Sequence, residues 1–178
     1  MDVFTFTPAA YGPVVAALLA DARLPDLGPG SPVVTRRAAL ATFDPVTDFG
    51  RPVADARAAR ACHSGLWLLH DFLDESHAIS QDLDTPDGSF WHAVMHRREP
   101  DPSNAKYWWR KVGAHPVLGR LRERCPALGY AYADPYVFVD FCEAVRGKGG
   151  PDEHLAQRVQ MLEWELLFGW CFTRAFAG

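Results

Sequence analysis

The sequence predicts a mainly α-helical protein, an irregular bundle of about five to seven helices that forms one domain over residues 1–178. Three observations favour this fold class. An N-cap residue followed by proline, a common start of a helix, recurs at Thr7-Pro8, Asp101-Pro102 and Asp134-Pro135. The C-terminal stretch 152–175 carries apolar residues at helical spacing. No stretch keeps the alternating pattern of a β-strand for long.

Size and composition fit a single folded domain. The 178 residues are 48% hydrophobic and 22% charged, which supplies one sizeable core. The net charge of −4 disfavours a general nucleic-acid-binding protein. No apolar run approaches the roughly 20 residues that span a bilayer, and no secretory leader follows Met1. We therefore expect a cytoplasmic protein that binds neither nucleic acid nor a membrane, with its four cysteines reduced.

The N-terminal half is predicted to hold two helical regions and a connection between them. Thr7 is the expected N-cap of a helix that continues to about Arg23. Residues 24–53 contain scattered prolines and glycines and are expected to form a mostly irregular connecting segment with at most short helices. From 54 to 81 helix-forming residues dominate.

Within that region, residues 66–81 are expected to form one buried central helix that contacts the last helix. At helical spacing, His70 and His77 fall on the same face, and a second apolar face carries Phe72 and Ile79. A helix that is apolar on two sides is typical of the centre of a fold.

The C-terminal half is predicted to consist of short helices followed by one long one. Ser89 is the expected N-cap of a helix to about Glu99. Further helices are expected at 101–113, 116–124, 134–146 and 152–175.

The segment around His92 is the strongest candidate for chemistry. His92, His96 and Glu99 lie at positions i, i+4 and i+7, so their side chains share one helical face. Two imidazoles one turn apart can bind one metal ion, and the carboxylate can act as a third ligand or as a base. The short connection at 82–88 favours antiparallel docking onto the helix that carries His70 and His77, which would complete the metal site. Hydrogen-bonded structural histidines are the alternative.

Glu163 is the second candidate, because its helical phase places a carboxylate on the apolar face of the last helix. A buried carboxylate is unfavourable unless it is paired, ligated or protonated. We expect Glu163 and Arg97 to act in catalysis, with Arg98 available to an anionic substrate. A purely structural ion pair between Glu163 and Arg97 is the alternative.

Asn104, Tyr107 and Trp108 are the candidates for the wall of a substrate pocket. They lie within about one helical turn of each other, so a polar group stands beside aromatic rings, as in many small-ligand pockets. Tyrosine and tryptophan are also ordinary core residues. The surrounding segment 97–124 has eight Lys/Arg against three Asp/Glu, which fits either an anion-binding surface or a solvated helix face.

Several motifs together resemble a family of bacterial and fungal proteins without an assigned activity. The resemblance covers roughly residues 66–170 and is carried by LHDFLDESH (69–77), GSFWH (88–92), MHRREPD (95–101), NAKYWWR (104–110), VGAHP (112–116), and EW with LLF (163–164 and 166–168). It implies relatedness and no mechanism. The chain has no nucleophile elbow, Walker loop or dinucleotide-binding glycine motif.

The expected function is therefore that of a metal-dependent enzyme, such as a hydrolase, acting on a small anionic substrate. The cofactor would be zinc, iron or manganese, and oxygen chemistry at iron would use similar groups. A non-catalytic module that binds a small ligand or a protein through segment 97–124 is the alternative.

Overall fold

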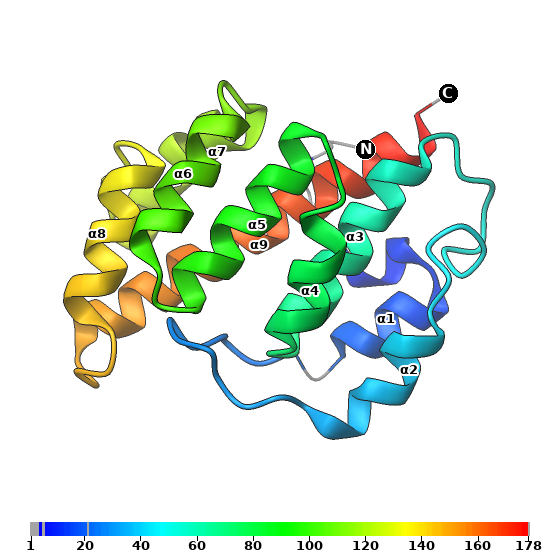
Figure 1. Cartoon of the computed structure of the whole chain (residues 1–178), viewed down its shortest axis with the longest axis horizontal. Coiled ribbons are helices and arrows are strands. Elements are labelled where there is room, and N and C mark those ends of the chain that lie inside the picture. Colours follow the sequence, from blue (N-terminus) through cyan, green and yellow to red (C-terminus); the bar gives the residue numbers. More distant parts are fainter. Residues whose placement is uncertain (1–3, 5, 21, 178) are drawn as a thin grey trace.

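The computed structural model describes residues 4, 6–20 and 22–177, and the fold is mainly helical (Figure 1). Helices make up 67% of the described residues, which contain no strand. These residues form nine α-helices and three short 3₁₀-helices: η1 (Pro8–Tyr11), α1 (Pro13–Leu19), η2 (Val34–Arg36), α2 (Arg37–Thr42), α3 (Ala56–Leu69), α4 (Leu73–Ser80), α5 (Pro86–Arg98), α6 (Pro102–Val112), α7 (Pro116–Arg124), η3 (Cys125–Leu128), α8 (Pro135–Val145) and α9 (Pro151–Phe176). The mainly helical prediction is confirmed, whereas the expected count of five to seven was too low.

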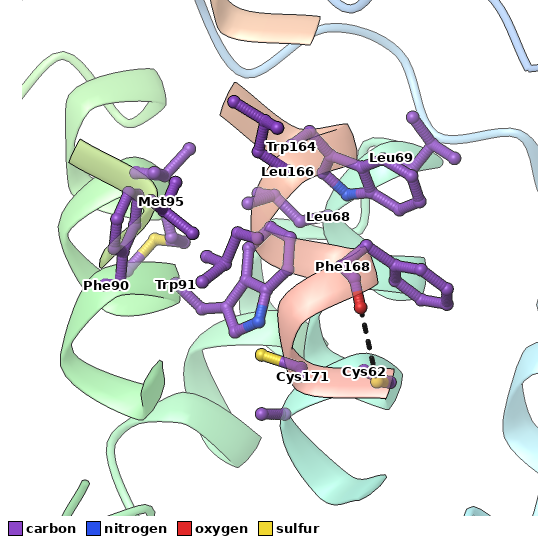
Figure 2. Packing of buried hydrophobic residues seen from close by; sticks show 14 of the residues in the cluster. Cys62, Leu68, Leu69, Phe90, Trp91, Met95, Trp164, Leu166, Phe168 and Cys171 are labelled. Carbon is purple, nitrogen blue, oxygen red and sulfur yellow. Dashed lines mark hydrogen bonds between the residues drawn. The ribbon is translucent and has the colours of Figure 1, made fainter. Parts of the chain in front are cut away.

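The core lies where α3 and α9 pack together and α5 covers them (Figure 2). Trp91 and Trp164 are buried there, with ring centroids 6.1 Å apart. Trp164 stacks on Phe168 at 4.8 Å and donates its indole N–H to the Gly65 carbonyl at 2.8 Å. A Cβ atom on Gly65 would lie 2.6 Å from the Trp91 ring, so this position of α3 requires glycine.

The expected continuous helix over 66–81 is wrong, because the chain turns a corner between α3 and α4. Asp71 has a φ of 65°, a left-handed conformation that ends α3 and redirects the chain into α4. Its carboxylate is buried and accepts hydrogen bonds from Arg98, Arg23 and the Ser31 backbone N–H, which hold the corner. These partners are distant in the sequence, so helical periodicity could not indicate them.

Two predicted helices also differ from the structure. The single helix expected over 7–23 is divided by Gly12, whose φ of 87° separates η1 from α1. The N-cap of α5 is Thr85 rather than Ser89: the Thr85 hydroxyl accepts from the Gly88 N–H at 3.0 Å, and Pro86 occupies the first turn. Segment 24–53 contains η2 and α2.

Helices α4, α5 and α6 form the part of the fold that positions the candidate site. α5 packs against both α4 and α6, as Figure 1 shows in green. Asp101 caps α6 by accepting from the Asn104 N–H at 3.0 Å, with Pro102 at the start of the helix, as predicted. None of the helices in the described part of the chain has the length and apolar character needed to cross a membrane.

Candidate metal centre

Three histidines converge between α4 and α5. His77 comes from α4, and His92 and His96 come from successive turns of α5. One ring nitrogen from each lies within 4.8 Å of the others, and the ring centroid of His77 is 4.6 Å from that of His92 and 5.4 Å from that of His96. Among the described residues, this is the one group of three or more His, Cys, Asp or Glu side chains close enough to share a metal ion. The predicted convergence of His92 and His96 with His77 is confirmed.

His92 and His96 face each other through their Nε2 atoms, which lie 2.9 Å apart. Two nitrogens bound at about 2.0–2.1 Å to one ion, at an angle between about 90° and 109°, are about 2.8–3.4 Å apart. Both rings are buried, at 2% and 5% exposure. The pair is therefore already spaced as two neighbouring ligands of one metal ion.

Two contacts hold the His96 ring. On the far side, its Nδ1 lies 2.8 Å from Oε2 of Glu99, one turn further along the chain. On the side that faces His92, the Asn104 amide nitrogen lies 3.0 Å from Nε2. A carboxylate on the far nitrogen of a metal-binding histidine is a common arrangement, because it fixes the tautomer and makes the ligand more basic. Glu99 thus lies behind the ligand, not beside it.

His92 is held by packing. Its ring stacks on Trp108 from α6, with centroids 3.9 Å apart and an interplanar angle of 22°. Its Nδ1 is buried without a well-aligned hydrogen bond, although the Ser80 carbonyl is near enough to favour a proton on this ring.

Burial keeps these imidazoles neutral. Desolvation, reinforced by the charges that His96 and His77 would carry, lowers the pKa of His92 to about 3. Desolvation also lowers the pKa of His96, and Glu99 opposes this effect. Neutral imidazole is the form that binds metal.

In the absence of a cation, the two neutral rings cannot satisfy all their neighbours. If His96 carries its proton on Nδ1, toward Glu99, then His92 must donate from Nε2, and its buried Nδ1 is left without a hydrogen-bond partner. With both protons moved to the other nitrogens, the bare Nδ1 of His96 faces the Glu99 carboxylate. A cation between the two Nε2 atoms removes this conflict, because both Nδ1 atoms can then carry hydrogens that point outward.

The structure does not bring His70 into this group. Its Nε2 lies 3.0 Å from the Leu18 carbonyl oxygen, on the other side of the Asp71 corner. The sequence places His70 in the metal site only if residues 66–81 form one continuous helix. The corner at Asp71 interrupts that helix, so His70 and His77 do not share one helix face.

Arg97 and Glu163 pair with each other inside the protein. Arg97 Nη2 lies 2.5 Å from Glu163 Oε2, and both side chains are at most 1% exposed. Arg97 also donates to Gln160 at 3.3 Å and lies over the Phe138 ring, so it faces α8 and α9. The predicted burial and pairing of Glu163 are confirmed, and the pair has the geometry of the structural alternative.

Arg98 is equally occupied. It donates to the Asp71 carboxylate, to the Leu68 carbonyl at 2.6 Å and to the Gly28 carbonyl at 3.1 Å. It therefore ties the irregular segment and the corner to α5, and its buried guanidinium has no donor directed at the histidines.

The proposed pocket residues of α6 separate into two groups. Asn104 and Trp108 contact His96 and His92, whereas Tyr107 is 43% exposed and its ring lies near Lys111 and Arg110. Lys111 was missed in the sequence, although Asn104, Trp108 and Lys111 stand at positions i, i+4 and i+7 of one helix face. This spacing is the sequence signal that could have identified Lys111 as a neighbour of the site.

A hollow adjoins the histidine group. It has a volume of about 550 Å³, and its wall includes Ser89, Trp108 and Lys111.

No protein-family model matches the chain, and no curated protein or solved structure matches it.

Proposed function

We propose that this protein binds one divalent transition metal ion through His77, His92 and His96 and acts as a metal-dependent hydrolase. The observation that carries the proposal is the 2.9 Å separation of the two Nε2 atoms of His92 and His96, with Glu99 bonded to the far side of His96. Three imidazoles suit zinc or ferrous iron better than manganese, which prefers oxygen ligands.

Three protein ligands are typical of a catalytic site, because structural zinc sites are closed by four. A metal ion held by His77, His92 and His96 would supply the water-activating and Lewis-acid chemistry that hydrolysis of an ester or amide needs. His77 is partly exposed whereas His92 and His96 are buried, so a substrate would approach the group from the side of His77.

The chain's own residues have distinct tasks in this proposal. Glu99 holds the proton on His96 Nδ1 and thereby keeps Nε2 available as a ligand. Trp108 covers the His92 ring and excludes water from that side. The Asn104 amide, next to His96, is a neutral donor that a substrate oxygen could use.

The non-catalytic alternative receives less support. It relies on the basic character of segment 97–124, but Arg97 and Arg98 are buried in ion pairs, and Lys106 pairs with Asp140. The free cations are therefore fewer than the sequence suggested.

Metal binding is tested by calorimetric titration of the chelator-treated protein with zinc, ferrous iron and manganese. We expect one equivalent of zinc or iron to bind, and cobalt substitution to give the absorption of a four-coordinate site. His92→Ala combined with His96→Ala should abolish uptake, whereas His154→Ala, at an exposed histidine of α9, should leave it unchanged. Uptake by the wild type no greater than that of the double variant would refute the metal site.

Hydrolysis is tested separately with the zinc-loaded protein. We expect turnover of activated esters that disappears on chelation and returns when zinc is restored. Stoichiometric zinc binding without such turnover would reject the hydrolase while leaving the metal centre in place.

A further inference from the structure

The hollow lies beside the histidine group, because Trp108 both lines the hollow and stacks on His92. Its wall includes residues of α5 and the residue that follows the end of α4. Gln81 follows His77 by four residues, just beyond the end of α4, and Ser89 precedes His92 by three residues on α5. Positions three or four apart lie on the same helix face, so the hollow begins one turn from the ligands.

The third wall is a stripe of α6 side chains that runs from the metal group into the hollow. Asn104 contacts His96, Trp108 stacks on His92, and Lys111 lines the hollow one turn further on. The hollow and the candidate metal centre thus share the Trp108 side chain, which lines one and packs on the other.

Two opposite charges line the hollow without neutralising partners. Lys111 lies over two aromatic rings: its Nζ is 4.3 Å from the Trp108 centroid and 5.0 Å from that of Tyr107. Asp84 comes from the loop between α4 and α5. Within the part of the chain that the structure describes, neither side chain forms an ion pair, in contrast to Arg97 and Arg98, whose carboxylate partners are buried.

We infer that this hollow is the substrate-binding site and that it takes a small zwitterion, with a carboxylate at Lys111 and an ammonium group at Asp84. The inference rests on the proposed metal-dependent function, because only the metal centre would make the bound molecule a substrate. A short peptide carries both charges and places an amide bond between them, which is the bond that a neighbouring metal-bound hydroxide would attack.

The size and charge of the hollow favour a small zwitterion over an inorganic anion. A volume of about 550 Å³ falls in the usual range for small-molecule sites and exceeds what a single inorganic anion needs. A phosphate dianion would meet one cation and be repelled by Asp84. The Trp108 ring offers an apolar wall for a side chain of the bound peptide.

The probe is the dipeptide phenylalanylglycine, titrated calorimetrically into the full-length protein in the presence of a chelator. Without metal, the peptide cannot bind by chelating zinc, so this measurement is independent of the metal centre. We expect the unmodified dipeptide to bind, and both its N-acetyl derivative and its C-terminal amide to bind at least about tenfold more weakly, because each loses one charge-assisted contact.

Variants assign each charge to its partner. Lys111→Met should weaken binding of the dipeptide and remove the difference between the dipeptide and its C-terminal amide. Asp84→Asn should remove the difference between the dipeptide and its N-acetyl derivative. Arg110→Met is the matched control, because Arg110 neighbours Lys111 but lies outside the hollow.

The inference is overturned if the dipeptide does not bind, or if the neutralised derivatives bind equally well. It is also overturned if Arg110→Met weakens binding as much as Lys111→Met does. Zinc titration of the same samples separates the two proposals: normal zinc uptake with no peptide binding removes the zwitterion site alone, and absent zinc uptake removes the metal centre.

Discussion

The Nε2 atom of His92 lies 2.9 Å from the Nε2 atom of His96, while the Nδ1 atom of His96 is bonded to Glu99. Both rings therefore turn the same type of nitrogen toward the centre of the group. Glu99, the hydrogen-bond partner on the far side of His96, is therefore as useful a position for testing the proposed site by mutation as the histidines themselves.

Glu99→Gln is expected to weaken zinc binding by about 10- to 100-fold, because loss of an outer carboxylate partner lowers the basicity of the ligand and loosens its orientation. The fold should be retained, since the Glu99 side chain is 53% exposed. Calorimetric titration with zinc measures the effect. Glu123→Gln, at another half-exposed glutamate, is the control; equal zinc affinity in wild type and Glu99→Gln would remove Glu99 from the site.

Glu163→Gln is expected to reduce the free energy of unfolding by about 3–5 kcal/mol, because it leaves the Arg97 cation buried without its counter-charge. The double substitution Arg97→Met with Glu163→Leu should be less destabilising than Glu163→Gln alone, since it removes both charges. Urea unfolding monitored by circular dichroism gives both values. A loss below about 1 kcal/mol in the single variant would contradict the burial of the pair.

The metal-free protein is expected to lose stability as the pH falls below about 6.5. Unfolded histidine takes up a proton near pH 6.5, whereas the folded pKa of His92 is lowered to about 3. Between these values the unfolded chain binds more protons, so the free energy of unfolding decreases with falling pH. Burial also lowers the pKa of His63, His70 and His96, which adds to the effect.

This pH dependence is measured by urea unfolding at intervals from pH 7.5 to 4.5 in the presence of a chelator. His92→Gln should flatten the curve, because one of the histidines that resist protonation is removed. His154→Ala serves as the control at an exposed position. A His92→Gln curve parallel to that of the wild type would show that His92 does not contribute.

Gly65→Ala is expected to destabilise the fold by about 1–3 kcal/mol, because the new Cβ atom would lie 2.6 Å from the buried Trp91 ring. Gly119→Ala is the matched control: no atom lies within 4 Å of its added Cβ, and the substitution should stabilise α7 by about 0.5–1 kcal/mol. Thermal unfolding of both variants tests this contrast. Equal shifts in Tm would show that Trp91 does not pack on Gly65.

The parts of the site that depend on local spacing were predictable from the sequence. The i, i+4 pair of His92 and His96 needed only helical periodicity, and the approach of His77 needed only a short connection between two helices. The burial of Glu163 followed from its phase on α9.

The parts that depend on long-range partners were not predictable. Arg98 and Ser31 stabilise the left-handed conformation of Asp71, and they reach it from distant parts of the chain, so the separation of His70 from His77 left no periodic signal. The spacing of Asn104, Trp108 and Lys111 indicated a shared helix face, but the hollow that Lys111 lines forms only when α6 is docked on α5.

The Asp71 corner has a consequence for metal affinity. Arg98 belongs to α5, the helix that also carries His92 and His96. Its contact with Asp71 also holds the corner at which α4 begins, and α4 carries His77. The relative placement of all three imidazoles is thus set by the fold, so binding of the proposed metal ion would need little reorganisation. Selectivity among ions would then depend on how well each one fits a rigid opening.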